Sequence, residues 1–293
     1  MMRRRSRRRI PVIPGLAKRR VRSVLAISVV SLCAIAVFKL CESSVGRRIP
    51  AALAASAAAA YASAPSVKQM LEEMGAIFSQ KIEEDFSLSV QIDLTPRQSW
   101  HIVVEPGGHV VVGEGPDQRA QFIISTSVET LRMMYEGKMT GLTAAGKAHG
   151  AEVAPLELQP VEDIEFTPEL RVKVFSFIQH FFNRSMPERV LLREEHSRMV
   201  HGGHAIPLYY HPGFRSAWYL LKKGERLNEP GDTNPFHQAF VFISGEGFAK
   251  IGDETITVKA GESYYIPPGS DHVVWTESEE PLVLIFLAWG EGA

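Results

Sequence analysis

The stretch from Gly231 to Thr276 constrains the fold more than any other part of this chain. Apolar and polar residues alternate there in short runs, and each run is cut off by Gly, Pro or Asp. This pattern predicts consecutive antiparallel strands, because the side chains of a strand point alternately to its two faces. Strands this short cannot each bury a face alone, so we expect them to close on one another as a jelly-roll β-barrel.

One turn within this stretch carries a resemblance to a known family. Gly261, Pro267, Gly269 and His272 stand at the fixed positions of the second cupin motif, and the stretch resembles a cupin domain. Proline presets such a turn and glycine relaxes it. The resemblance implies a cup-shaped jelly roll into which His272 points, where its imidazole can bind a metal or a substrate.

The first cupin motif departs from the family pattern. Where the family has a carboxylate and two histidines, this sequence has Gln238, Asn234 and Asp232. His237 lies one residue before Gln238, and only a slip or a bulge of the strand would turn it inward. A divalent ion such as Fe, Mn, Zn or Ni needs several imidazole or carboxylate ligands. The candidate ligands are therefore His272, His237 and Asp232, and a metal-free cup is the favoured alternative.

Tyr264 lies on the strand that enters the same turn. In a metal-dependent enzyme it is the candidate catalytic proton donor. The alternative, which we favour, is that Tyr264 is a structural residue.

The N-terminal region predicts a membrane topology. Residues 1–22 are arginine-rich and broken by prolines, as in a basic cytoplasmic tail. Residues 23–41 hold the uncharged run Val24 to Phe38, whose length lies between a signal-peptide core and a short transmembrane helix. The preceding Arg and Lys residues predict a single-pass signal anchor with the folded domains on the far, periplasmic or extracytoplasmic side. A cleaved signal and an organelle-targeting peptide are the alternatives.

Composition and motifs exclude several function classes. Both cysteines, Cys33 and Cys41, precede the expected folded part, which therefore has neither a disulfide nor a cysteine nucleophile. The formal net charge is -1, and membrane topology and anionic lipids explain the basic tail better than nucleic acid does. No phosphate-binding loop or nucleophile elbow is present in a suitable context. Residues 42–65 are an alanine-rich linker.

Residues 66–165 have the pattern of an α+β domain. Apolar residues recur at three- and four-residue steps from Val67 to Phe86, which predicts a helix with Ser66 as its N-cap. Four alternating runs follow and predict a four-stranded meander. A second helix is expected from Ser127 to Gly137. Helices should cover one face of the sheet.

This order of elements resembles the sterol carrier protein domain. The resemblance rests on the runs Val90 to Leu94, Trp100 to Val104 and Ser127 to Lys138. It implies a tunnel for an apolar ligand such as a fatty acyl group or a sterol. Methionine suits a wall that adapts to a flexible guest, and core residues are the alternative interpretation of the same side chains. The candidate lining residues are Trp100, Phe122, Met133, Met134, Met139 and Leu142.

Residues 166–190 predict a connecting helix with Thr167 as N-cap and Pro168 at its first position. Its apolar stripe should pack against either domain or a second copy of the chain. Residues 191–293 form the expected cupin domain, with first and last strands near Arg215 to Lys222 and Leu282 to Trp289. The fold class is thus α+β followed by an all-β barrel.

Two functions follow from these patterns. The first is a membrane-tethered binding protein that holds an apolar ligand in the carrier domain and a small molecule in the cupin cup, with dimerisation through the cupin as an expected partner contact. The second is a metal-dependent cupin enzyme, an oxygenase or isomerase acting on a lipid-derived substrate. The altered first motif favours the first function, and the intact turn before His272 supports the second.

Overall fold

The computed structural model describes residues 64–95, 97–147 and 153–293. The basic tail, the apolar run and most of the alanine-rich linker lie outside these residues. The described part of the chain belongs to one compact unit, Ala64–Ala293, which is a mixed α+β structure. Within the described residues, no helix is both long enough and apolar enough to cross a membrane.

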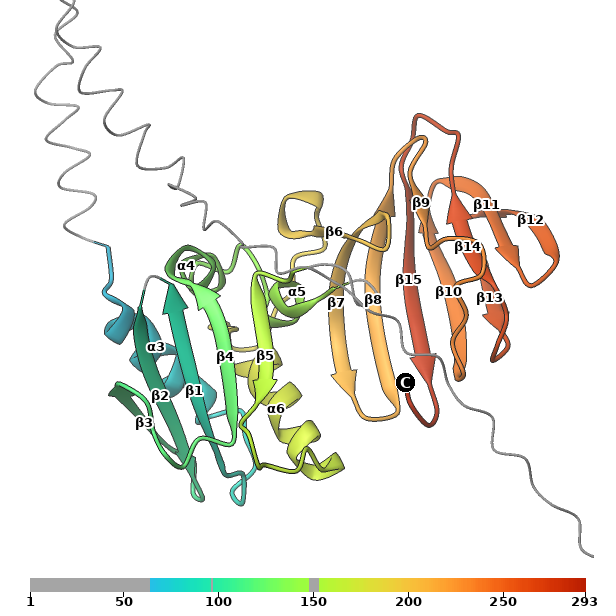
Figure 1. Ribbon diagram of the computed structural model, residues 1–293. Coiled ribbons are helices and arrows are strands. Elements are labelled where there is room, and N and C mark those ends of the chain that lie inside the picture. Colours follow the sequence, from blue (N-terminus) through green and yellow to red (C-terminus); the bar gives the residue numbers. More distant parts are fainter. Residues whose placement is uncertain (1–63, 96, 148–152) are drawn as a thin grey trace, which may run out of the picture. The chain divides into compact units, whose positions relative to one another are not determined.

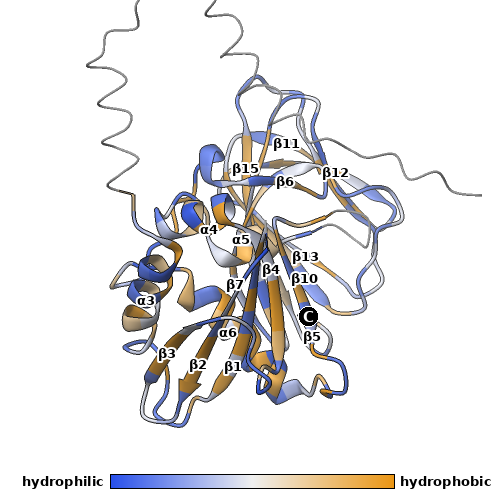
Figure 2. Cartoon of the chain, turned by 60° about the vertical axis from the view of Figure 1, so that its left-hand side comes forward, coloured by the Kyte–Doolittle hydropathy of each residue, from blue (hydrophilic) through white to orange (hydrophobic). Residues whose placement is uncertain are grey.

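The first half of this unit contains one five-stranded sheet and four helices (Figure 1). The sheet order is β3-β2-β1-β4-β5. In Figure 2, β1 and β2 carry hydrophobic residues interrupted by hydrophilic ones. The elements are α3 (Val67–Phe78), β1 (Leu88–Thr95), β2 (Gln98–Glu105), β3 (His109–Glu114), β4 (Phe122–Ser127), α4 (Val128–Tyr135), α5 (Gly141–Ala145), β5 (Leu156–Pro160) and α6 (Pro168–Phe181).

The predicted four-stranded meander is wrong at its last strand. β4 does not pair with β3 but runs parallel to β1, with Ile92 opposite Ile124. The reason lies in burial: β3 is largely exposed, as suits an edge strand, whereas β4 buries Phe122, Ile124 and Thr126 and needs neighbours on both sides. The fifth strand, β5, pairs with the other side of β4. This strand is not among those predicted from the sequence.

The N-cap of the first helix was predicted correctly, but the position where the helix ends was not. The Ser66 side chain accepts a hydrogen bond from the Gln69 N–H, and the Gln69 side chain accepts one from the Ser66 N–H, which completes a capping box. The helix ends at Phe78, however, instead of continuing to Phe86. Ile82 still packs against the core from the turn that follows, so its apolar spacing did not require a helix.

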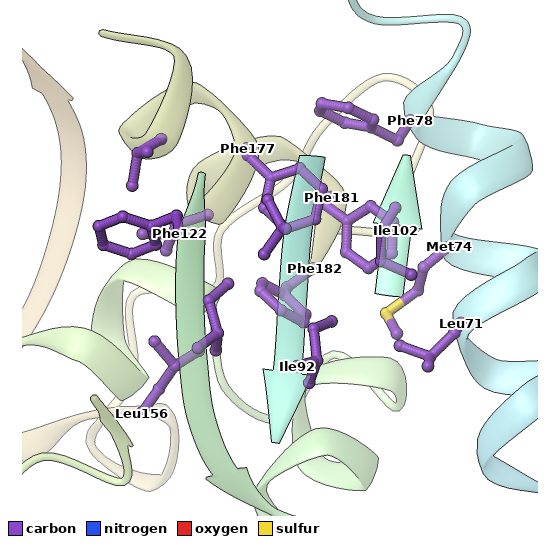
Figure 3. Packing of buried hydrophobic residues seen from close by; sticks show 14 of the residues in the cluster. Leu71, Met74, Phe78, Ile92, Ile102, Phe122, Leu156, Phe177, Phe181 and Phe182 are labelled. Carbon is purple, nitrogen blue, oxygen red and sulfur yellow. The ribbon is translucent and has the colours of Figure 1, made fainter. Parts of the chain in front are cut away.

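Helix α6 belongs to the core of the first half. Thr167 caps it and Pro168 opens it, as expected. Figure 3 shows Phe177 and Phe181 pointing among the side chains of α3 and the sheet, and the Phe177 ring meets that of Phe78 edge to face at 5.4 Å. Each fully buried phenylalanine contributes about 1.5–3 kcal/mol. The helix is therefore part of this core and more than a linker between the domains.

The second half folds as two antiparallel sheets. The larger has the order β13-β10-β15-β8-β7-β6 and the smaller β12-β11-β14-β9. The elements are β6 (Arg198–Val200), β7 (Gly203–His211), β8 (Phe214–Leu221), β9 (Arg226–Leu227), β10 (His237–Ser244), β11 (Glu246–Ile251), β12 (Glu254–Lys259), β13 (Ser263–Ile266), β14 (His272–Trp275) and β15 (Leu282–Trp289), with a short helical turn at Glu194–His196 before them.

Apolar side chains fill the space between these two sheets. Phe240 and Phe242 from β10, Leu284 from β15 and Val274 from β14 are buried there together. This arrangement is the expected sheet-rich jelly roll. β6 and β7 precede the predicted first strand, and the turn between them uses the sequence His201 to His204, where Gly202 has φ +81.

A buried ion pair fastens the segment after α6 to the first half. Lys81 Nζ lies 2.7 Å from Glu188 Oε1 with its side chain 5% exposed, and it also donates to the carbonyl oxygens of His180 and Asn183. We expect Lys81→Met to destabilise the fold by about 3 kcal/mol, because it leaves the partly buried Glu188 carboxylate without the Lys81 ammonium group. Urea unfolding measures this loss. An unchanged midpoint would contradict it, and Lys68→Met at an exposed pair on α3 is the control.

The same carboxylate predicts a pH dependence. Burial alone would raise the pKa of Glu188, but hydrogen bonds from His180 and Lys81 and their charges hold the pKa below its ordinary value. A carboxyl with a lowered pKa in the folded state stabilises the fold above its unfolded pKa and loses that contribution as the pH falls through the folded value. Glu188→Gln should therefore flatten the fall in thermal stability below about pH 4. Parallel melting curves for both proteins there would count against the pair.

Candidate functional site

The turn between β13 and β14 sets the geometry of the cup. Gly269 adopts φ +77, a conformation that glycine takes without strain. Its N–H donates to the Asn234 carbonyl at 2.7 Å, so the turn is tied to the loop that precedes β10. Pro267 and Gly269 thereby place the start of β14 beside that loop.

His272 is the first residue of β14 and is only 3% exposed. Its Nδ1 lies 3.2 Å from the Ser270 carbonyl oxygen. A carbonyl can only accept, so Nδ1 carries the proton and Nε2 has a free lone pair. The Asn234 Nδ2 group lies 3.4 Å from Nε2 and donates to it. The nitrogen that would bind a metal thus already accepts an amide hydrogen.

Gln238 completes a cluster with these two residues. The Asn234 amide nitrogen donates to Gln238 Oε1 at 3.0 Å, and Gln238 is fully buried on β10. Its Nε2 finds no hydrogen-bond partner among the described residues. The structure therefore brings together His272, Asn234 and Gln238, which the sequence aligned with the ligand positions of the two cupin motifs.

Asp232 and His237, the other candidate ligands, do not complete a metal site. Asp232 Oδ2 accepts from the Glu229 N–H at 2.9 Å and is one of the charges near His272. His237 is exposed on the outer face of the barrel, with its Nδ1 2.6 Å from the Tyr265 hydroxyl and its ring stacked on Trp289. The strand register is regular from His237 to Phe242. The bulge that would turn His237 inward is not formed.

These side chains do not fit a transition-metal ion. The cluster offers one imidazole and two neutral amides, whereas Fe, Mn, Zn and Ni sites use several imidazole, thiolate or carboxylate ligands. No group of three His, Cys, Asp or Glu side chains suited to a metal occurs in the described part of the chain. The ligand atoms of this cluster therefore do not support the divalent metal that the sequence suggested as a cofactor.

Burial also sets the charge state of His272. Burial lowers the pKa of its imidazole, against opposing effects of the Ser270 carbonyl and the charges of Asp232 and Asp271. The ring is therefore neutral near pH 7. It acts as a hydrogen-bond acceptor within the cluster and carries no charge of its own.

A cavity of about 230 Å³ opens beside this cluster. Its walls combine polar and aromatic side chains from several strands. Sequence reasoning missed Arg215 and Tyr219, which come from β8. The alternation along β8, which buries Ala217, Tyr219 and Leu221 toward the barrel core, was the signal that could have found them. The side chains that define the cavity are Arg215, Tyr219, Asn234, Phe240, His272 and Phe286.

Tyr264, the candidate proton donor, does not face this cavity. Its hydroxyl donates to Glu262 at 2.9 Å, and its ring packs edge to face on Phe242. Glu262 lines a separate hollow of about 520 Å³ with Glu246 and Thr276. The hydroxyl is thus engaged away from His272, and the structure gives it a structural role.

The candidate lining of an apolar tunnel lies in the core of the first half. Trp100, Phe122, Met134 and Leu142 are buried in one cluster with the phenylalanines of α6, and Met139 packs against it. Met133 is half-buried. The structure thus places these side chains in a packed core to which α6 contributes.

Comparisons with known proteins agree with the barrel. The cupin domain family matches residues 220–288. No curated protein matches the chain. Among solved structures, a cupin 2 conserved barrel domain protein of Salinispora arenicola is 20% identical, covering 35% of this chain and 88% of its own, with a TM-score of 0.32. An RmlC-like cupin of Methanocaldococcus jannaschii is 16% identical over 32% of this chain and 85% of its own, with a TM-score of 0.28.

A third solved structure is the cupin domain of an XRE family transcriptional regulator from Enterobacter cloacae, 20% identical over 30% of this chain and 97% of its own, with a TM-score of 0.28. The identification rests on the family match and on the turn, strands and inward histidine described above. The chain therefore carries a C-terminal cupin domain at residues 220–288.

Proposed function

We propose that the cupin cup of this protein binds a small molecule without a metal ion, and that the sequence before residue 64 tethers the protein to a membrane. The observation that carries the proposal is the contact between Asn234 and His272. Because the amide donates to His272 Nε2, the imidazole is engaged within the protein. The uncharged run Val24 to Phe38 and the arginines before it support the tether.

The cavity has the character of a binding pocket. Polar side chains such as Arg215, Asn234 and His272 line it together with apolar ones, among them Phe240, Phe286 and Leu227. Small-molecule sites combine these two features, since apolar walls give affinity and a few polar groups fix orientation. Its volume, about 230 Å³, is below that of sites for drug-sized ligands. The ligand is accordingly a small metabolite.

Metal analysis separates this proposal from the enzyme hypothesis. The purified full chain should hold well under one equivalent of Fe, Mn, Zn or Ni, because the cluster of His272, Asn234 and Gln238 offers one imidazole and two amides. The double substitution Asn234→His and Gln238→Glu should create a His, His and Glu set and raise zinc or manganese binding toward one equivalent. Elemental analysis after dialysis measures both proteins.

The control is His237→Ala, which removes an imidazole from the outer face of the barrel. Stoichiometric metal in the unchanged protein that is lost in His272→Ala and kept in His237→Ala would instead establish the metal-dependent enzyme.

The second candidate function is an apolar-ligand carrier in the first half. It rests on the resemblance to the sterol carrier domain, and on an unusually aromatic core to which α6 contributes Phe177, Phe181 and Phe182. In the described arrangement these rings belong to the same core cluster as Trp100 and Phe122. An acyl chain would enter only where α6 side chains give way.

Lipid binding tests the carrier directly. We expect Phe181→Ala to leave a cavity in the core and to increase binding of a fluorescent fatty acid several-fold, because an apolar void accepts apolar guests. Ile243→Ala, at an exposed position on β10, is the control because it leaves no void. Mass spectrometry should find co-purified lipid with the unchanged protein. If no lipid co-purifies and the fatty acid binds neither protein, the carrier function is wrong.

A further inference from the structure

We propose that the ligand of the cup is a small organic acid whose carboxylate binds Arg215 at the mouth of the cavity. The inference rests on the proposed binding function and adds to it the chemical class of the ligand. It is carried by the guanidinium of Arg215, by the charged residues among those that line the cavity, and by the Tyr219 hydroxyl.

Among the described residues, the half-buried cation Arg215 has no anionic partner. It lines the cavity from β8, and its guanidinium lies over the ring of Phe236 at 4.5 Å. Its Nε atom is buried with no hydrogen-bond partner in the described part of the chain. Burial lowers the pKa of Arg215, although a guanidinium stays charged in proteins. A buried charge is costly unless it is paired, so this site favours an anion supplied from outside.

The walls of the cavity carry no negative charge to meet that cation. Among the described residues that line it there is neither Asp nor Glu. The other cationic side chain at its edge, Lys147, is already paired with Glu157 at 3.0 Å. Arg215 is therefore the charged side chain of the described lining that has no ion-pair partner, and in a partly desolvated space its charge favours an anionic guest.

A planar carboxylate fits Arg215 better than other anions of this size. The guanidinium presents parallel N–H groups that match the two oxygens of a carboxylate.

The other residues that line the cavity indicate the chemical character of the rest of the acid. Burial raises the pKa of Tyr219 to about 12, so its hydroxyl keeps its proton and is available as a donor. Phe240 and Phe286 add apolar surface to the same cavity. An aromatic or short branched acid bearing one hydrogen-bond acceptor far from its carboxylate matches these features.

Matched acids and amides test the inference. Isothermal titration of the full chain in detergent with benzoate and benzamide, nicotinate and nicotinamide, and phenylacetate and phenylacetamide compares probes of nearly equal shape that differ in charge. We expect at least one acid to bind about ten-fold or more tightly than its amide, and Arg215→Gln to abolish that preference. Arg215→Lys should retain part of it, since the charge remains while the two-point contact is lost.

Arg226→Gln is the matched control, because Arg226 stacks on Trp275 and does not line the cavity. It should leave acid binding unchanged, and thermal melting shows that each variant is folded. If an acid and its amide bind equally, and Arg215→Lys and Arg215→Gln leave both unaffected, the ligand is not an anion at Arg215 but the binding function stands. If neither series binds, both the inference and the proposed function are wrong.

Discussion

The amide of Asn234 governs what the cup of this protein can do. It donates to Gln238 Oε1 and to His272 Nε2. These two side chains stand at positions where the family motifs have metal ligands. A single neutral side chain thus joins the two motif segments of the barrel. Its bonds depend on the Gly269 turn, which is itself tied to the Asn234 carbonyl, so position and chemistry at this site are fixed together.

This constraint changes the kind of chemistry that the barrel supports. A cluster of amides and one neutral imidazole orients a guest through hydrogen bonds and cannot supply the charge of a coordinated ion. The charge in this cavity comes instead from Arg215 on β8, on a different strand from the motif residues. The fold is that of a cupin cup, and the cationic side chain that lines it from β8 is Arg215, which lies outside the motif segments.

The sequence predicted the barrel well because its signals are local. The turn at Pro267 to Gly269, the strand alternation and the caps at Ser66 and Thr167 each depend on a few neighbouring residues, and the structure has them. The parallel pairing of β4 with β1 could not be predicted in this way, since it depends on which strand is more buried. The place of α6 in the first core likewise depends on the partners of its phenylalanines.

The candidate site was predicted in part for the same reason. Motif spacing found His272, Asn234 and Gln238, and the structure brings these three together. Motif spacing alone could not rule out a bulge at His237, because only the pairing of β10 with β15 shows an unbroken register there. Arg215 went unnoticed because an arginine at the start of a strand is commonplace; its meaning comes from the absence of a partner among the described residues.

The tautomer of His272 tests the central claim most directly. In a nitrogen-15 spectrum of the histidine rings at pH 7, with His272→Gln for assignment, the account predicts a neutral ring protonated at Nδ1, with Nε2 as a hydrogen-bonded acceptor. The signals should not change when a chelator or zinc is added at one equivalent. A metal-type shift of Nε2 that the chelator reverses would contradict the account.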